Sequence, residues 1–253
     1  MNSISTEAAE VKLEKVEVKE SKPRKIIVVS KTGSDHTFAD KNNHDYAFNL
    51  LNMKVVLDGC GEGKHSEVGT RVFSQLFARK VKEYIEKGES INCDNFVDVV
   101  DSVFKKMLEL CSDTSFVFQN YLFTILVCFE LEDEFVVFSC GDGFIIKETK
   151  EGISFERLDD GEYPAYYAYN FIEDKEHLKA HKEGVGFNVA HFSKSEYTNV
   201  GVATDGLRYS ENLMDLEKAR MMKILHNGGP GIEKLINKNN QHGMFHDDIS
   251  ICF

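Results

Sequence analysis

The chain has 253 residues, of which 42% are apolar, and it carries a formal net charge of −12 with a pI near 5.3. This length and apolar content are enough to bury a sizeable core, and they favour one large domain over two. The negative charge argues against a nucleic-acid or anionic-membrane partner and leaves acidic residues available for binding cations.

The six cysteines and the apolar runs bear on the compartment. Cysteines 60, 93, 111, 128, 140 and 252 contain no CxxC pair, which fits reduced thiols in a core better than a disulfide framework or a zinc site. No apolar run approaches the roughly 18 residues that span a membrane, and the N-terminus lacks the apolar core of a signal peptide. We expect a cytoplasmic protein without a membrane partner, and we expect a monomer.

The predicted elements begin after residues 1–24, a charge-rich stretch without aromatic residues that we expect to be a flexible N-terminal arm. Within it, the alternating segment VKLEKVEVKE (11–20) is also compatible with an edge strand. Three short strands follow, in KIIVVS (25–30), DYAFNLL (45–51) and MKVVLD (53–58).

Helical periodicity replaces the strand pattern over the next segment. Apolar residues recur at helical spacing over 68–85 and again over 96–108, which predicts two amphipathic helices. The run LFTILVCFELEDEFVVFSCGDGFIIKE (122–148) then predicts three strands joined by turns at 132–134 and 141–143, as in antiparallel hairpins.

In the last third of the chain, we expect a segment without regular secondary structure, followed by strands and helices. Residues 159–195 contain paired tyrosines, scattered histidines and few apolar runs, so we expect no regular structure there. A strand in NVGVATD (199–205), helices over about 211–225 and 230–239, and a final strand ISICF (249–253) follow. Antiparallel strands combined with paired helices predict an α+β fold.

Several of these strands end or begin at aspartates. A lone Asp-Gly most often marks a turn, but a carboxylate at four strand ends predicts one shared site. Mg²⁺ and Mn²⁺ prefer oxygen ligands, so such a site would suit these ions. The residues are Asp58-Gly59, Asp142-Gly143, Asp205-Gly206 and Asp247-Asp248.

Six motifs in this order carry a resemblance to a known family: GSDHTFADKNNHDYAF, VVLDGCGEGKHSEVG, LFTILV, FSCGDGFII, GVATDGL and HDDISICF. They resemble the metal-dependent protein phosphatases of type 2C (PPM family), including a divergent microbial branch with a Gly-x-x-His lead-in. The resemblance covers residues 25–253, which we expect to form a single phosphatase domain. It implies two antiparallel β-sheets in a sandwich flanked by pairs of α-helices, in α-β-β-α layers, with a dinuclear metal centre at one end.

The resemblance also implies an activity and a set of site residues. The activity is that of a serine/threonine protein phosphatase, which hydrolyses phosphate monoesters of a phosphoprotein substrate with a metal-activated water. The cofactors would be two Mg²⁺ or Mn²⁺ ions, with an additional, weaker third site. Matched by position, the catalytic and metal-binding residues are Asp45, Asp58, Asp205 and Asp247. Asp58 would bridge the two ions, Gly59 would offer its carbonyl oxygen, Asp142 would help to hold the third ion, and Asp248 would support the site through a hydrogen bond.

The chain departs from the family pattern at several positions. His44 stands where many members carry glutamate or glutamine, and it could bind a metal, hydrogen-bond a water or only occupy space. Cys60 replaces a histidine proposed as general acid in eukaryotic members; it is either a thiol made reactive by nearby cations or a small core residue. The family's phosphate-holding arginine has no clear match, and Lys41 is the nearest basic candidate. His36, in the lead-in, is either structural or a substrate contact.

These departures leave one alternative function. A catalytically weak or inactive phosphatase-fold module could act as a regulatory or binding protein. The retained metal carboxylates favour the enzyme. Substrate recognition is expected in residues 159–195 and 207–222, because surface loops carry specificity in such folds.

Overall fold

The computed structural model describes residues 26–158, 164–173, 178 and 181–253. In chain order its elements are β1 (Val28–Lys31), α1 (Ser34–Phe38), β2 (Tyr46–Leu50), β3 (Met53–Gly59), α2 (Ser66–Glu86), α3 (Phe96–Leu110), α4 (Thr114–Asn120), β4 (Phe123–Glu130), β5 (Glu134–Cys140), β6 (Gly143–Glu148), β7 (Ile153–Leu158), η1 (Tyr167–Phe171), β8 (Asn188–Ser193), β9 (Asn199–Ala203), η3 (Asp205–Asn212), α5 (Asp215–His226), α6 (Ile232–Asn240) and β10 (Ile249–Cys252). The expected arm, residues 1–24, with its alternative edge strand, lies outside the described residues.

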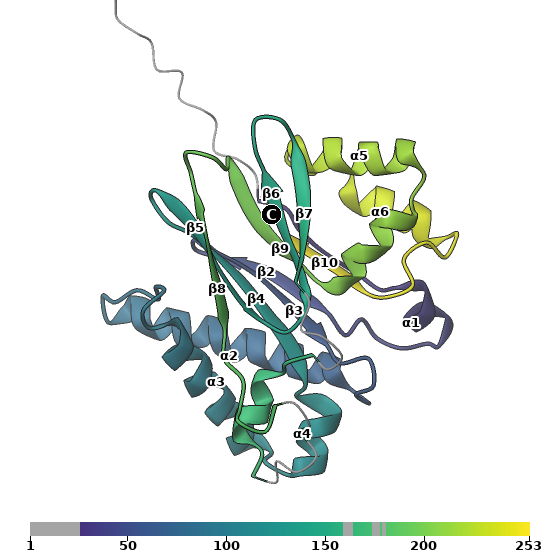
Figure 1. Ribbon diagram of the computed structural model, residues 1–253. Coiled ribbons are helices and arrows are strands. Elements are labelled where there is room, and N and C mark those ends of the chain that lie inside the picture. Colours follow the sequence, from purple (N-terminus) through teal and green to yellow (C-terminus); the bar gives the residue numbers. More distant parts are fainter. Residues whose placement is uncertain (1–25, 159–163, 174–177, 179–180) are drawn as a thin grey trace, which may run out of the picture.

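The strands form two antiparallel sheets that pack face to face. One sheet has the order β1-β10-β9-β6-β7, and the other has the order β2-β3-β4-β5-β8. Helices α2 and α3 cover the outer side of the second sheet, and α5 and α6 cover the first (Figure 1). The predicted α-β-β-α sandwich is therefore confirmed.

Three apolar clusters fill the spaces between these layers. Strand β3 contributes to two of them, which explains the unbroken apolar run in its sequence. Val55 and Leu57 belong to the cluster under α2 and α3, whereas Val56 belongs to the cluster between the sheets. Successive side chains of a strand point to opposite faces, so a strand that is buried on both faces needs apolar residues at every position. The third cluster lies under α5 and α6 and includes Leu225 and Ile236.

Two strands, β7 and β8, and the short helices α1, α4, η1 and η3 were not predicted. Strand β8 lies within 159–195, where we expected no regular structure, so that expectation was wrong. It pairs with β5 from Glu134↔Ser193 to Ser139↔Asn188, but Phe192 is its only buried residue. An edge strand that is held by backbone pairing needs few buried side chains, so its sequence shows little alternation of apolar residues. The same holds for β7, which has no buried residue. Helices α1 and α4 have 5 and 7 residues, too few for a visible period.

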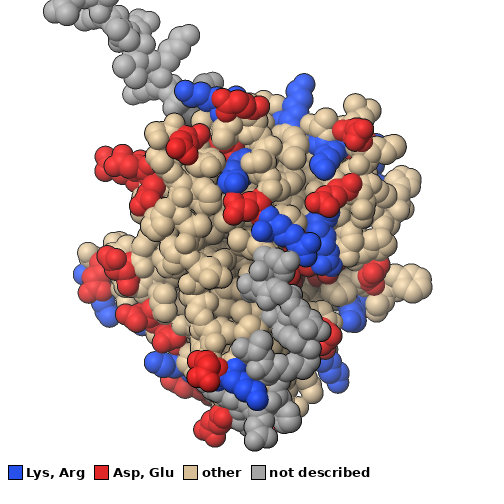
Figure 2. Space-filling view, viewed as in Figure 1, with Lys and Arg blue, Asp and Glu red and all other residues tan. Residues whose placement is uncertain are grey.

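The cysteines agree with the expectation of a reduced core. All six are free, and Cys128, Cys140 and Cys252 are buried. None of the helices in the described part of the chain combines the length and apolar character needed to cross a bilayer. On the described part of the face in Figure 2, acidic and basic side chains are interspersed.

Candidate functional site

The predicted site residues come from both sheets and meet at one edge of the sandwich. β10 contacts β2 and β3, and β9 contacts β3, so the ends of these strands lie together. The aspartates are placed as follows: Asp45 directly before β2, Asp58 in β3, Asp142 between β5 and β6, Asp205 at the start of η3 after β9, and Asp247 and Asp248 directly before β10.

Their electrostatics show that five of these carboxyl groups share one environment. Burial raises the pKa of Asp58 well above its usual value, and the charges of Asp45, Asp205, Asp247 and Asp142 raise it further, in that order. Burial also raises the pKa of Asp45 and of Asp247. Carboxylates that disfavour one another's charge form a site that attracts cations.

The predicted donor set, carboxylate oxygens together with the Gly59 backbone carbonyl, is of the kind that hard divalent ions prefer. Among the described residues, however, no three His, Cys, Asp or Glu side chains already stand at metal-binding positions.

Arg208 lies between two of these aspartates, although it was not among the predicted site residues. Its Nη1 is 2.7 Å from Asp205 Oδ2 and its Nη2 is 3.3 Å from Asp247 Oδ2. The signal that could have found it is its spacing of three residues from Asp205, which places two side chains on one face of a helical turn.

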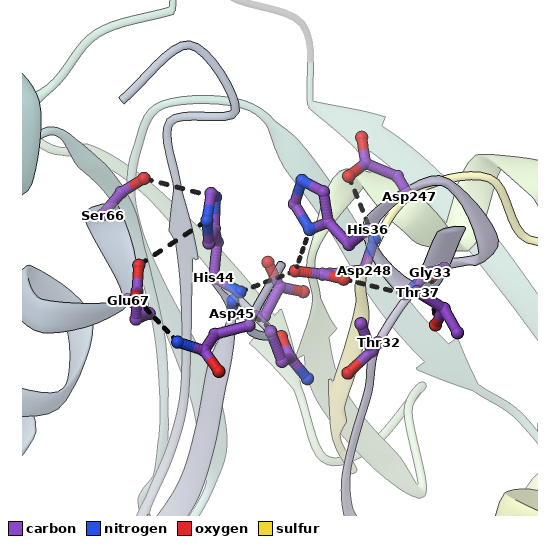
Figure 3. Close-up of polar contacts among 12 residues, drawn as sticks. Thr32, Gly33, His36, Thr37, His44, Asp45, Ser66, Glu67, Asp247 and Asp248 are labelled. Carbon is purple, nitrogen blue, oxygen red and sulfur yellow. Dashed lines mark hydrogen bonds and ion pairs between the residues drawn. The ribbon is translucent and has the colours of Figure 1, made fainter. Parts of the chain in front are cut away.

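Asp248 connects three segments at the base of the site. Its carboxylate accepts hydrogen bonds from the backbone N–H of Gly33 at 2.8 Å, the backbone N–H of His44 at 2.6 Å and His36 Nδ1 at 2.9 Å (Figure 3). Asp248 is only 2% exposed. The hydrogen bond with Asp248 raises the pKa of His36, although burial opposes this. The contacts of Asp248 and His36 are those expected of structural hydrogen-bonding residues.

His44 and Asp45 are each oriented by neighbours. The ring of His44 lies between Ser66 Oγ at 3.4 Å and Glu67 Oε2 at 3.6 Å, and burial lowers its pKa. Both ring nitrogens of His44 therefore face protein groups. Asp45 Oδ2 accepts a hydrogen bond of 2.7 Å from the Thr204 hydroxyl. Thr204 was also missed, although it directly precedes Asp205 in the ATDGL motif.

The family follows from the sequence match. The model of the family described as protein phosphatase 2C matches residues 32–229. The chain belongs to the protein phosphatase 2C family. No curated protein matches it.

Solved structures of serine/threonine phosphatases share this fold at low identity. The serine/threonine phosphatase Stp1 from Staphylococcus aureus superposes with a TM-score of 0.60 and 13% identity, with 98% of each chain covered. The catalytic domain of the serine/threonine protein phosphatase PstP, in complex with 2 manganese ions, has a TM-score of 0.57 and 15% identity, covering 90% of this chain and 96% of that one. MsPP from Mycobacterium smegmatis, in complex with cacodylate, has a TM-score of 0.57 and 13% identity, with the same coverage. These likenesses show the fold.

The glycines of the protein phosphatase 2C motifs are required by space. Neither Gly59 nor Gly206 has a positive φ, so backbone conformation does not demand glycine at these two positions, whereas Gly143, after Asp142, has a φ of 144°. A Cβ at Gly206 would lie 1.8 Å from the Asp248 carbonyl oxygen, and one at Gly59 would lie 2.8 Å from the His44 carbonyl oxygen. Gly33, in the lead-in, is pressed against Asp247 in the same way. These contacts hold the strand ends together.

The remaining predicted residues, Cys60 and Lys41, lie around the aspartates. Cys60 is partly buried. It lies against Tyr166, whose pKa is raised by burial and further by the charge of Cys60 and a hydrogen bond with it. Lys41 is exposed, and its charge lowers the pKa of both His36 and His44, although other causes are larger.

Proposed function

We propose that this member of the protein phosphatase 2C family is a metal-dependent serine/threonine protein phosphatase that hydrolyses phosphate monoesters on a phosphoprotein. The observation that carries the proposal is the meeting of five aspartates from both sheets, four of which raise the pKa of Asp58. The family match and the two manganese ions in the complex of the PstP catalytic domain support it.

In this proposal Asp45, Asp58, Asp205 and Asp247 hold two Mg²⁺ or Mn²⁺ ions together with the Gly59 carbonyl, and Asp142 contributes to a third, weaker site. When bound, these ions lower the pKa of a water molecule for attack on phosphorus and neutralise the phosphoryl oxygens.

The chain's own residues fix the geometry that this chemistry needs. Thr204 holds one oxygen of Asp45, which leaves the other oxygen available to an ion. Asp248 ties the start of β10 to Gly33 and His44, so that the carboxylates before β2 and before β10 keep their spacing. Rigid support of this kind is what a metal-assisted reaction requires of a protein.

The test is hydrolysis of p-nitrophenyl phosphate and of a phosphothreonine peptide in Mn²⁺. We expect turnover in the wild-type protein, and we expect its loss in EDTA and in Asp58→Asn. Asp133→Asn, at an exposed carboxylate in the turn between β4 and β5, is the matched control and should remain active. Near wild-type turnover in Asp58→Asn would show that the site is misassigned.

The alternative, an inactive phosphatase-fold module, has one observation in its favour, namely that Arg208 already neutralises two of the aspartates. Absence of turnover with Mg²⁺, Mn²⁺ and other divalent ions would support that alternative.

A further inference from the structure

The guanidinium of Arg208 occupies the position of a cation in the aspartate cluster. It joins Asp205, at the start of η3, to Asp247, which precedes β10, at distances of 2.7 and 3.3 Å. Both contacts use the Oδ2 atom of the aspartate. These two carboxylates belong to different segments, so one charged side chain bridges the parts of the site that metal ions are expected to bridge.

A divalent ion and the guanidinium would compete for the same oxygen atoms. When a carboxylate oxygen coordinates a divalent ion, the ion repels the guanidinium, because two positive charges at this separation interact strongly. Binding of metal therefore requires Arg208 to move. Its side chain is 38% exposed, so it is free to turn toward solvent.

Tyr209 limits how far the displaced guanidinium can go. Arg208 Nη2 donates to the Tyr209 hydroxyl at 3.1 Å, and the guanidinium carbon lies 4.9 Å from the centroid of the Tyr209 ring. Neither contact uses the aspartates, so both can persist after metal binding. The charge of Arg208 then stays close to the aspartates, beside Tyr209.

We propose that Arg208 is the phosphoryl-binding residue of this protein, paired with Asp205 and Asp247 in the metal-free state and with the oxygens of the substrate phosphoryl group once ions occupy those carboxylates. The inference rests on the function proposed above. A guanidinium presents two parallel N–H donors that match two phosphoryl oxygens. Lys41, the basic residue singled out from the sequence, is exposed and makes no ion pair with these aspartates in the described part of the chain, whereas Arg208 contacts both.

Two titrations on the full-length protein test both halves of the exchange. In the first, Mn²⁺ is titrated into EDTA-stripped protein by calorimetry. Arg208→Gln should bind Mn²⁺ severalfold more tightly than the wild type, because the competing cation has been removed. In the second, inorganic phosphate is titrated into Mg²⁺-saturated protein, and Arg208→Gln should bind it roughly tenfold or more weakly, the loss expected for hydrogen bonds between charged groups.

Two further variants make the comparison specific. Arg208→Lys keeps the charge without the two-pronged geometry, so its phosphate affinity should lie between those of the wild type and Arg208→Gln. Arg220→Gln, at an exposed arginine of α5 that lies 3.9 Å from Glu217, should change neither titration. In steady-state assays on the phosphopeptide, Arg208→Gln should raise KM more than it lowers kcat.

The outcomes separate this inference from the proposed function. Unchanged phosphate affinity in Arg208→Gln would overturn the inference about Arg208. Mn²⁺-dependent turnover of the wild-type protein would still support the proposed phosphatase activity in that case. Weaker Mn²⁺ binding in Arg208→Gln also overturns it, because Arg208 would then support the metal ligands instead of competing with ions. A wild-type protein that binds no Mn²⁺ at all would reject the phosphatase and the role of Arg208 together.

Discussion

Asp248 should contribute more to folding stability than any surface carboxylate, because it is the shared acceptor for three segments. Its donors are Gly33 N–H at 2.8 Å, His44 N–H at 2.6 Å and His36 Nδ1 at 2.9 Å. Gly33 and His44 lie 215 and 204 residues away in the chain. Asp248→Ala would leave all three donors without this acceptor, in two buried contacts and one partly buried contact.

The expected cost follows from these contacts. Hydrogen bonds to a charged group contribute about 1.5–3 kcal/mol each, but they do not add fully. Removing one partner from a buried charged network costs about 3–5 kcal/mol, and we expect Asp248→Ala to fall in this range. Asp248→Asn keeps the volume but turns one acceptor oxygen into a donor, which affects the Gly33 contact alone if the amide oxygen faces His36 and His44. We expect it to cost about 1–3 kcal/mol.

The assay is urea denaturation in EDTA, followed by circular dichroism because the chain has no tryptophan. EDTA removes any contribution from bound ions, so the comparison reports on the hydrogen bonds. Asp133→Asn, the exposed carboxylate in the β4–β5 turn, is the control and should stay within about 0.5 kcal/mol of the wild type. An Asp248→Ala variant that loses less than about 1 kcal/mol would refute this reasoning, since that is the typical worth of a single ordinary hydrogen bond.

Three further predictions concern the aspartates and their glycines. In EDTA the raised pKa of Asp58 makes the native state bind its proton more tightly, so stability should fall as pH rises above the unfolded value near 3.8. Asp58→Asn should remove that loss and raise the melting temperature of the metal-free protein at pH 7; an equal or lower melting temperature would contradict this. Gly206→Ala should destabilise by about 3 kcal/mol or more, because its Cβ would lie 1.8 Å from the Asp248 carbonyl oxygen, whereas Gly61→Ala, with no atom within 4 Å, should be neutral in the same denaturation assay. Asp142→Ala should lower turnover several-fold while calorimetry still detects the two tight Mn²⁺ sites, and their loss would show that Asp142 belongs to the core pair.

The interior strands could be predicted from the sequence because burial on both faces leaves an apolar run that no other element explains. Val55, Val56 and Leu57 are at most 1% exposed, although they face two different clusters. The run then stops at Asp58, a carboxylate that packing alone would not select. This contrast made the strand-end aspartates visible as a set.

Contacts between distant segments were beyond the sequence because they depend on how the layers stack. The pairing of Arg208 with Asp247 joins η3 to the residues before β10, 39 positions away. No local sequence pattern predicts such a contact. Strand β8 was not predicted for a different reason. It is stabilised by backbone hydrogen bonds to β5, which any sequence can make, so its side chains did not have to follow an apolar pattern.

The central claim is that the aspartates around Asp58 form a two-ion centre, and anomalous scattering from Mn²⁺-soaked crystals tests it most directly. We predict two anomalous peaks next to the Asp58 carboxylate, within reach of Asp45, Asp205 and Asp247. The guanidinium of Arg208 should have left its position between Asp205 and Asp247. A map without a peak next to Asp58 at saturating Mn²⁺, in crystals that diffract well enough to show the sulfur atoms of the chain, would contradict the claim.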